Sequence, residues 1–156
     1  MQLLTERLFL IPLHTDALQK LIDRTTDPET AKAYRDMLNG CESHPDQWLW
    51  YTAWGLYQND SGDWVGDLCF KGLPETGNPE IGYGIEPEFW NQGYTTEAVR
   101  AACKWALEQP GVCAIEAETE AETESDNAAS QAVLRKVGFV PTGTLGEEGP
   151  RFILRG

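Results

Sequence analysis

A strand-like run, a short turn and a helix-like run follow one another in the middle of this chain and constrain its fold most. Residues 81–86 (Ile-Gly-Tyr-Gly-Ile-Glu) read as a strand, and residues 90–95 (Trp-Asn-Gln-Gly-Tyr-Thr) lead into a helix expected to begin near Thr96. The first N–H groups of a helix lack partners within it, and the helix dipole adds positive charge there. The turn therefore predicts a binding site for a phosphate or pyrophosphate group.

This turn differs from the two best-known phosphate-binding loops. It has no Gly-Lys-Ser/Thr ending, as a Walker A loop would. Only one glycine, Gly93, occupies it, so it is not a dinucleotide-binding fingerprint. Taken alone, the segment also fits an ordinary strand-to-helix connection in which Gly93 permits a tight bend.

The rest of the chain predicts strands and helices in a mixed order, with no linker, so we expect one domain spanning residues 1–156. Gly138 suits the left-handed position that ends a helix, while Asn39-Gly40 is expected to stop an earlier one. An aromatic stretch at 45–51 has no clear form, and 120–126 reads as an acidic loop. The predicted helices are 15–24, 28–38, 96–108 and 127–137; the predicted strands are 5–13, 53–58, 64–71, 80–86, 112–119, 139–145 and 151–155.

Three segments resemble the GNAT-fold acyl-CoA N-acyltransferases, in particular the ribosomal-protein alanine N-acetyltransferase branch. They are residues 5–13 (Thr-Glu-Arg-Leu-Phe-Leu-Ile-Pro-Leu), residues 80–98 with the turn described above, and residues 127–139 ending in Lys-Val-Gly-Phe. Together they span nearly the whole chain in the order of that family. The resemblance implies an α/β (mixed α+β) fold with a central, mostly antiparallel sheet of about six to seven strands and about four flanking helices. The sheet would splay where the pantetheine arm of the cofactor enters.

The resemblance also implies acetyl-CoA as co-substrate. In the family, backbone amides of the loop wrap the pyrophosphate, the strand before it lines the pantetheine, and an Asn side chain meets that arm. Two positions depart from the family loop, because Trp90 replaces a Gln or Arg and Thr95 replaces a Gly or Ala. The matching residues are Gln92, Gly93, Tyr94, Thr95 and Thr96 in the loop, Gly84, Ile85 and Glu86 in the strand, and Asn127.

Acetyl transfer to an amine needs a base for the amine proton and a proton source for the leaving thiolate. Glu80 stands where some family members place a catalytic Glu, with Glu75 and Glu86 as lesser candidates. Leu134 occupies the position of the tyrosine that protonates the thiolate in many members, and it cannot donate. Ser130 lies one turn earlier on the same helix face and matches a proposed thiolate partner of the ribosomal branch, so we assign it both a catalytic and a cofactor-facing role.

The aromatic residues Trp48, Tyr51 and Trp54 fall where family members build the acceptor side. They would line an amine pocket, in which a cation could bind over the face of an indole ring. The alternative is that they pack the sheet against the early helices. The sequence leaves both interpretations open.

The formal net charge of −13 disfavours nucleic acid as a partner, because a phosphate backbone would be repelled. It also disfavours unaided binding to anionic membranes. It suits a cationic acceptor, or serves solubility alone. The sequence contains no run of 18 apolar residues, so we predict no membrane span. It also shows no export signal, so we expect a cytoplasmic protein. Cys41 and His44 alone cannot hold a metal, and we expect none.

The resemblance implies an N-acetyltransferase that moves an acetyl group from acetyl-CoA to a primary amine, either a protein N-terminus or a small amine. The amine would attack the thioester directly in a ternary complex, with no acyl-enzyme. The alternative is a non-catalytic CoA-binding or regulatory module of the same fold. Whether the chain is a monomer or a homodimer stays open.

Overall fold

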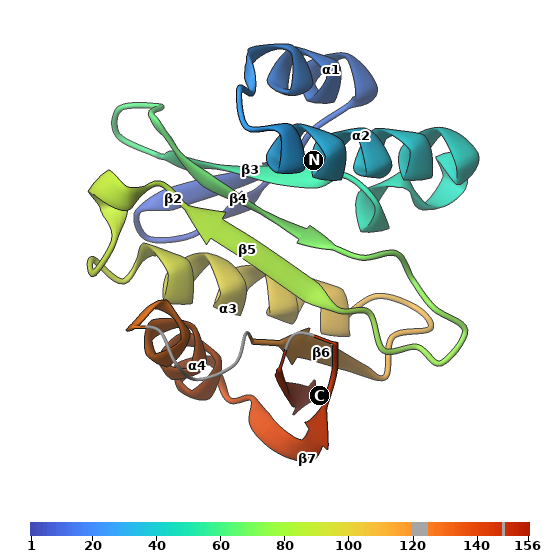
Figure 1. Cartoon of the computed structure of the whole chain (residues 1–156), viewed down its shortest axis with the longest axis vertical. Helices are drawn as coiled ribbons and strands as arrows, with labels where there is room; N and C mark the ends of the chain where they lie inside the picture. Colours follow the sequence, from blue (N-terminus) through green and yellow to red (C-terminus); the bar gives the residue numbers. More distant parts are fainter. Residues whose placement is uncertain (120–124, 148) are drawn as a thin grey trace.

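Two antiparallel sheets form the frame of the computed structural model, and helices cover both faces of the larger sheet (Figure 1). The structure describes residues 1–119, 125–147 and 149–156, and for residues 125–128 it describes the backbone alone. The larger sheet has the strand order β1-β2-β3-β4-β5, and the smaller sheet has the order β6-β8-β7. The strands are β1 Leu3–Leu4, β2 Leu8–Pro12, β3 Ala53–Gln58, β4 Trp64–Phe70, β5 Ile81–Ile85, β6 Ala114–Glu118, β7 Val140–Leu145 and β8 Pro150–Arg155.

Helices α1 and α2 lie on one face of the larger sheet and α3 lies on the other (Figure 1). Asp27 caps α2 by accepting a hydrogen bond from the Thr30 N–H at 3.0 Å, and Pro28 occupies the first helical position, where its missing N–H costs nothing. The helices are α1 Thr15–Arg24, α2 Pro28–Ser43, α3 Tyr94–Leu107 and α4 Ser125–Val137, with short 3-10 helices η1 Pro45–Trp50 and η2 Pro87–Phe89. Within the described parts of the chain, none of the helices is long and apolar enough to cross a membrane.

Two predicted boundaries are wrong for identifiable reasons. The strand expected at 5–13 begins only at Leu8, because residues 5–7 form the turn that connects β1 to β2. Helix α2 also continues past Asn39 and Gly40 to Ser43. A Cβ at Gly40 would come within 2.6 Å of a ring carbon of Tyr51, so this glycine makes room for an aromatic ring and does not stop the helix.

The core of the larger sheet is built from aromatic rings that meet between the sheet and α3. Trp105 of α3 packs against Trp50, Trp54 and Phe70, with ring centroids 5.0, 4.9 and 6.0 Å away. Contacts of this kind bury large apolar areas and fix the relative placement of the elements. Helix α3 is thereby held against strands β3 and β4.

The two sheets touch at one end and separate at the other. Glu80, just before β5, forms an isolated parallel bridge with Glu116 of β6, and the N–H of Glu116 donates to the carbonyl of Pro79 at 2.9 Å. No further ladder joins β5 to β6, although both strands are fully described. The predicted splay is confirmed, but it divides eight described strands into two sheets.

Candidate active site

The last residues of β5 pair with β4 along one edge, and no strand of the described residues pairs with the other edge. The N–H of Glu86 donates to the carbonyl of Val65 at 2.9 Å, so Glu86 and, two residues earlier, Gly84 turn their peptide groups toward β4. Because peptide groups alternate along a strand, those of Tyr83 and Ile85 face the gap between β5 and β6. A free strand edge of this kind offers amide donors and carbonyl acceptors to an extended ligand.

This alternation revises the expected lining of the pantetheine path. Of the three strand residues, Ile85 has its peptide group on the gap edge, whereas Gly84 and Glu86 do not. The Ile85 carbonyl accepts a hydrogen bond from the indole Nε1 of Trp90 at 2.7 Å. Tyr83 was missed, because the paired edge is known only once the neighbouring strand is known.

The start of α3 lies directly after the turn and is open to an anion. Asn91 and Gly93 both have left-handed backbone, with φ of 61° and 81°, and no side chain among the described residues caps the helix. The helix begins at Tyr94, two residues earlier than predicted, so Thr95 and Thr96 lie in its first turn. The N–H groups of this turn have no partner within the helix and carry the positive end of its dipole. All five predicted loop residues lie at this helix start.

A pair of hydroxyl groups links β5 to α4 across the gap. The hydroxyl oxygen of Tyr83 lies 2.9 Å from the Oγ of Ser130, and burial raises the pKa of the Tyr83 phenol despite this hydrogen bond. Leu134 is 1% exposed and belongs to the core, as its apolar side chain requires. Ser130 is therefore hydrogen-bonded to a tyrosine of β5, whereas the family's tyrosine position on α4 holds Leu134. The side chain of Asn127 lies outside the described part of the chain.

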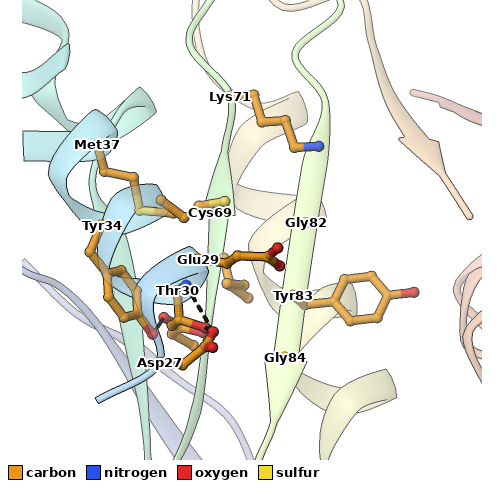
Figure 2. A pocket seen from close by; sticks show the side chains of 13 residues that line it. Asp27, Glu29, Thr30, Tyr34, Met37, Cys69, Lys71, Gly82, Tyr83 and Gly84 are labelled. Carbon is orange, nitrogen blue, oxygen red and sulfur yellow. Dashed lines mark hydrogen bonds between the residues drawn. The ribbon is translucent and has the colours of Figure 1, made fainter. Parts of the chain in front are cut away.

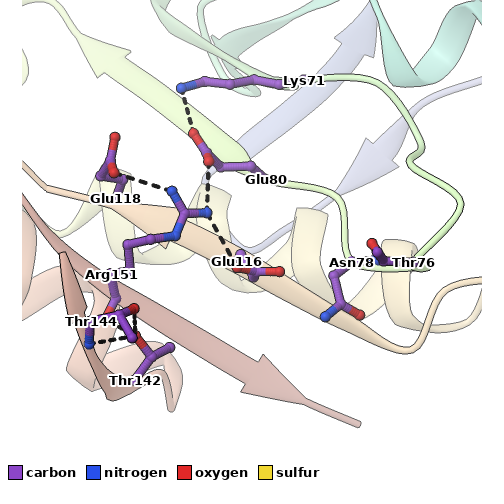
Figure 3. Close-up of polar contacts among 9 residues, drawn as sticks. All are labelled: Lys71, Thr76, Asn78, Glu80, Glu116, Glu118, Thr142, Thr144 and Arg151. Carbon is purple, nitrogen blue, oxygen red and sulfur yellow. Dashed lines mark hydrogen bonds and ion pairs between the residues drawn. The ribbon is translucent and has the colours of Figure 1, made fainter. Parts of the chain in front are cut away.

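Glu80 lies in an ion cluster at the closed end of the gap (Figure 3). Its carboxylate oxygens are 2.6 Å from Lys71 Nζ and 2.9 Å from Arg151 Nη2, and Arg151 also pairs with Glu116 and Glu118 at 3.2 and 3.1 Å. Burial alone would raise the pKa of Glu80, but the hydrogen bonds and charges of Lys71 and Arg151 outweigh it and lower the pKa. A carboxylate with both oxygens paired and a lowered pKa is a poor base, which disfavours the predicted role.

A cavity of about 430 Å³ lies between α2 and strands β4 and β5. Figure 2 shows Tyr34 and Met37 entering it from α2, while the ring of Tyr83 points to the far side of β5. Gly82 and Gly84 line the cavity without side chains, so it extends over the bare face of β5 toward the gap. Its charged or titratable lining residues are Asp27, Glu29, Tyr34, Asp67, Cys69, Lys71 and Tyr83.

Asp67 is the carboxylate of this cavity that is best suited to proton transfer. The Tyr34 hydroxyl donates to its Oδ2 at 2.7 Å. Burial raises the pKa of Asp67 above its usual range, and the Tyr34 hydrogen bond offsets only part of this effect. A Cβ built on Gly84 would lie 4.0 Å from Asp67 Oδ1, so only the bare strand face separates this carboxylate from the edge of the gap. The sequence analysis missed Asp67, because nothing local distinguishes it from other strand carboxylates.

The three aromatic residues expected on the acceptor side are not among the residues that line this cavity. Trp48 stacks on His14 with ring centroids 4.4 Å apart, and Tyr51 stacks on His44 at 4.3 Å. Trp54 is 0% exposed and part of the core. Their observed contacts therefore favour the alternative interpretation, in which they pack the sheet and early helices.

The cysteines near the gap are poorly suited to act as nucleophiles. Burial raises the pKa of Cys69 to about 11 and that of Cys103 to about 12, so both are protonated thiols at neutral pH. Cys113 is exposed just before β6. These thiols favour direct attack on a thioester over an acyl-enzyme.

The model of the acetyltransferase (GNAT) domain family matches residues 7–140, and the chain therefore belongs to the GNAT acetyltransferase family. It is 30% identical to the FsC-acetyl coenzyme A-N(2)-transacetylase of Aspergillus fumigatus, over 73% of this chain and 48% of that protein. It is 34% identical to the uncharacterized N-acetyltransferase YjdG of Bacillus subtilis, over 58% of this chain and 52% of that protein. The chain spans about half the length of these curated relatives.

A solved structure shares the fold over nearly the whole chain. The ribosomal L7/L12 alpha-N-protein acetyltransferase RimL, in complex with coenzyme A, superimposes with a TM-score of 0.72 at 15% identity. The match covers 99% of this chain and 96% of that one. At this level of identity the comparison shows a common fold.

Proposed function

We propose that this protein is an acetyl-CoA-dependent N-acetyltransferase that acetylates a primary amine. The observation that carries the proposal is the gap between β5 and β6. At its open end, β5 has an edge with which no described strand pairs, it leads to the start of α3, and its residues Gly82, Tyr83 and Gly84 line the cavity under α2. A thioester donor along the edge of β5 and an amine acceptor on its α2 face would thus reach the same strand.

The donor is proposed to bind with its pyrophosphate on the amides of residues 92–96 and its pantetheine along the β5 edge. Helix-start amides bind phosphate groups because their donors and the helix dipole both favour negative charge. The peptide groups of Tyr83 and Ile85 would pair with the amides of the pantetheine arm. We retain Asn127 as a proposed contact with that arm.

The acceptor is proposed to enter the cavity as a cationic amine. Asp27, Glu29 and Asp67 place three carboxylates along the lining, and the ammonium of Lys71 is paired with Glu80. This surplus of negative charge attracts a protonated amine. A small cationic amine and a basic protein N-terminus both fit this description.

In the proposed reaction, the bound ammonium first releases one proton to water, and the neutral amine nitrogen then attacks the thioester carbon while Asp67 takes the second amine proton. The raised pKa of Asp67 suits this role, since a base works best when its pKa approaches the working pH. As the carbon–sulfur bond breaks, the hydroxyls of Tyr83 and Ser130 stabilise the thiolate, and Tyr83 supplies its proton. Exchange with water then restores Asp67 and Tyr83, which leaves an amide and a free thiol as products.

Calorimetric titration with acetyl-CoA, together with a thiol-release assay on a panel of primary amines, tests this function. Wild-type protein should bind in the micromolar range, and Asn127→Ala and Gly93→Trp should bind more weakly. Gly93 has left-handed backbone, so a tryptophan there strains the turn.

The outcomes separate the alternatives. Binding with thiol release supports the enzyme. Binding without turnover on any amine points to a non-catalytic CoA-binding module of the same fold. No binding to the folded wild type contradicts the proposed function.

A further inference from the structure

The turn between β1 and β2 is fastened to the first helical turn of α3. The backbone N–H of Arg7 donates to Glu97 Oε2 at 2.8 Å, and Arg7 Nε donates to Glu97 Oε1 at the same distance. The hydroxyl of Thr5 also donates to Glu97 Oε2. A carboxylate held by three donors from a segment 90 residues away ties the beginning of the chain to the proposed donor site.

The same arginine also contacts the turn that precedes α3. Its Nη1 donates to the carbonyl oxygen of Gln92 at 2.9 Å, and its guanidinium carbon lies 4.2 Å from the centre of the Tyr94 ring. The planar guanidinium makes these contacts in several directions at once, as an ammonium group cannot. Arg7 therefore contacts the residues on both sides of Gly93.

The hydrogen bond to Gln92 determines how the next peptide group is oriented. In a trans peptide, the carbonyl and the following N–H point in opposite directions. With the Gln92 carbonyl turned toward Arg7, the Gly93 N–H points away from Arg7. If this peptide rotated, a carbonyl oxygen would replace the amide donor and would repel a phosphate group.

Arg7 also removes an electrostatic obstacle to anion binding. Burial alone would raise the pKa of Glu97, but the hydrogen bonds from Thr5 and Arg7 outweigh it and lower the pKa, so Glu97 is ionised at neutral pH. An unpaired carboxylate in the first turn of α3 would repel a pyrophosphate at the same helix start. The ion pair with Arg7 neutralises that charge at 2.8 Å.

We propose that Arg7 is a positioning residue for the acyl donor: it fixes the Gln92–Gly93 peptide so that its N–H is presented to the pyrophosphate. This inference rests on the proposed function, because it assumes that the turn binds the donor. It does not require Arg7 to touch the donor. It assigns a role to the Thr-Glu-Arg-Leu segment, which neither the predicted site nor the proposed reaction uses.

The test compares two donors in the full chain. Acetyl-CoA carries the pyrophosphate, whereas S-acetylpantetheine has the same thioester and arm without it. Arg7→Met should raise the KM for acetyl-CoA about tenfold, the equivalent of about 1.4 kcal/mol. Its kcat, and its kinetics with S-acetylpantetheine, should stay within about twofold of wild type. Lys32→Met is the matched control, because it removes an exposed ion pair with Asp36 and should change neither KM.

Arg7→Lys separates orientation from simple charge. A lysine keeps the positive charge but lacks the fork that reaches Gln92 and Glu97 together, so it should not restore the acetyl-CoA KM. Full rescue by lysine would overturn the inference, as would an equal loss with both donors. Thermal unfolding shows whether Arg7→Met or Arg7→Lys has failed to fold. If one has, the KM values of the other variant test the inference.

Calorimetry with CoA itself needs no turnover and separates this inference from the proposed function. Equal CoA affinity of wild type and Arg7→Met would overturn the inference whether or not the protein acetylates amines. Weaker CoA binding by Arg7→Met, in a protein that acetylates no amine, would support the inference and contradict the proposed catalysis. A wild type without affinity for CoA would overturn both.

Discussion

The two ends of the gap between β5 and β6 are built in opposite ways. At the closed end, Glu80 and Glu116 form a backbone bridge, and Arg151 reaches both of their carboxylates from β8. At the open end, the Tyr83 and Ile85 peptide groups face the gap, and hydroxyl contacts from Tyr83 to Ser130 reach α4. Charged hydrogen bonds hold the sheets together where no ligand is expected, and no described strand pairs with β5 where one is expected.

The difference shows how strand pairing can stop between two sheets while the sheets stay attached to each other. A strand that leaves one edge unpaired forgoes ladder hydrogen bonds, and something else must hold the neighbouring sheet in place. Here the ion cluster around Arg151 supplies that attachment at the base of the gap. Changes at the two ends should therefore affect different properties, stability at the closed end and activity at the open end.

Asp67→Asn should produce the largest effect, at the open end. An asparagine cannot take the amine proton, so kcat should fall by about 100-fold or more. The acetyl-CoA affinity should be unchanged, because Asp67 lies on the acceptor face. Steady-state kinetics measure this, with Asp63→Asn on an exposed loop as control. A kcat within a few-fold of wild type would exclude Asp67 as the base.

The same variant should have a distinctive pH dependence of stability. Because the pKa of Asp67 is raised in the folded state, folding favours its neutral form. Its contribution to stability is therefore present below the unfolded pKa and lost as pH rises through the folded pKa. Asp67→Asn should thus be more stable than wild type at neutral pH, and this gain should vanish below the pKa of Asp67 in the unfolded chain. Thermal unfolding across pH measures it.

Arg151→Met should produce the largest loss of stability, at the closed end. It leaves Glu80, Glu116 and Glu118 facing one another without their shared cation. Breaking such a partly buried cluster should cost about 2–4 kcal/mol. Denaturant unfolding measures this, with the exposed Arg155→Met on the same strand as control. Equal stability of the two variants would mean that the cluster does not hold the sheets together.

The pH dependence of this loss has a definite sign. The pKa of Glu80 is lowered in the folded state, so its contribution to stability is present above the unfolded pKa and is lost as pH falls through the folded pKa. The difference between wild type and Arg151→Met should therefore be largest at neutral pH and shrink in acid. A difference that grows in acid would contradict the assignment.

Side chains of increasing size at Gly84 test whether the acceptor passes over the face of β5 that carries no side chains. Its backbone is not left-handed, and a Cβ there meets nothing closer than Asp67 Oδ1 at 4.0 Å, so alanine and valine should both fold. Gly84→Val should raise the acceptor KM about tenfold by filling the path from the cavity, and Gly84→Ala should have a smaller effect. The donor KM should stay unchanged. An unaffected acceptor KM in both variants would place the acceptor elsewhere.

Tyr83→Phe should have the smallest effect, because Ser130 keeps its own hydroxyl near the thiolate. Loss of the phenol should lower kcat about threefold to tenfold without raising the acetyl-CoA KM, since a proton donor is removed and the ring is kept. Tyr57→Phe in β3 is the matched control. Equal kcat values for the two variants would remove Tyr83 from the proposed reaction.

Local patterns predicted much of the fold. Helix α1 has the predicted bounds because its apolar residues recur on one face, and the final hairpin lies where its strand-like runs and intervening turn indicated. The turn at Gly93 was predicted because its chemistry is local: a strand end, a glycine and a helix start. The expectation that Gly40 stops a helix was wrong, because its lack of a side chain makes room for the ring of Tyr51.

The candidate site was only partly visible, because its contacts join residues far apart in the chain. Tyr34 and Asp67 are 33 positions apart, Tyr83 and Ser130 are 47 apart, and Glu80 and Arg151 are 71 apart. Neither residue type nor spacing distinguishes such a pair from exposed side chains of the same kind. Ser130 was predicted by resemblance, whereas its partner Tyr83 required the packing of α4 beside β5.

The sequence by itself therefore determined most of the elements and the strand, turn and helix order around Gly93, since helix starts, glycine turns and apolar periodicity depend on neighbouring residues. The tertiary structure decided which edge of β5 pairs with a described strand, that Asp67 is partly buried beside the cavity, and that Glu80 is held in ion pairs. The physical reason is that pKa values and hydrogen-bond partners depend on burial and on distance through space. Glu80 and Asp67 are both strand-associated carboxylates, and only the folded chain gives them opposite pKa shifts.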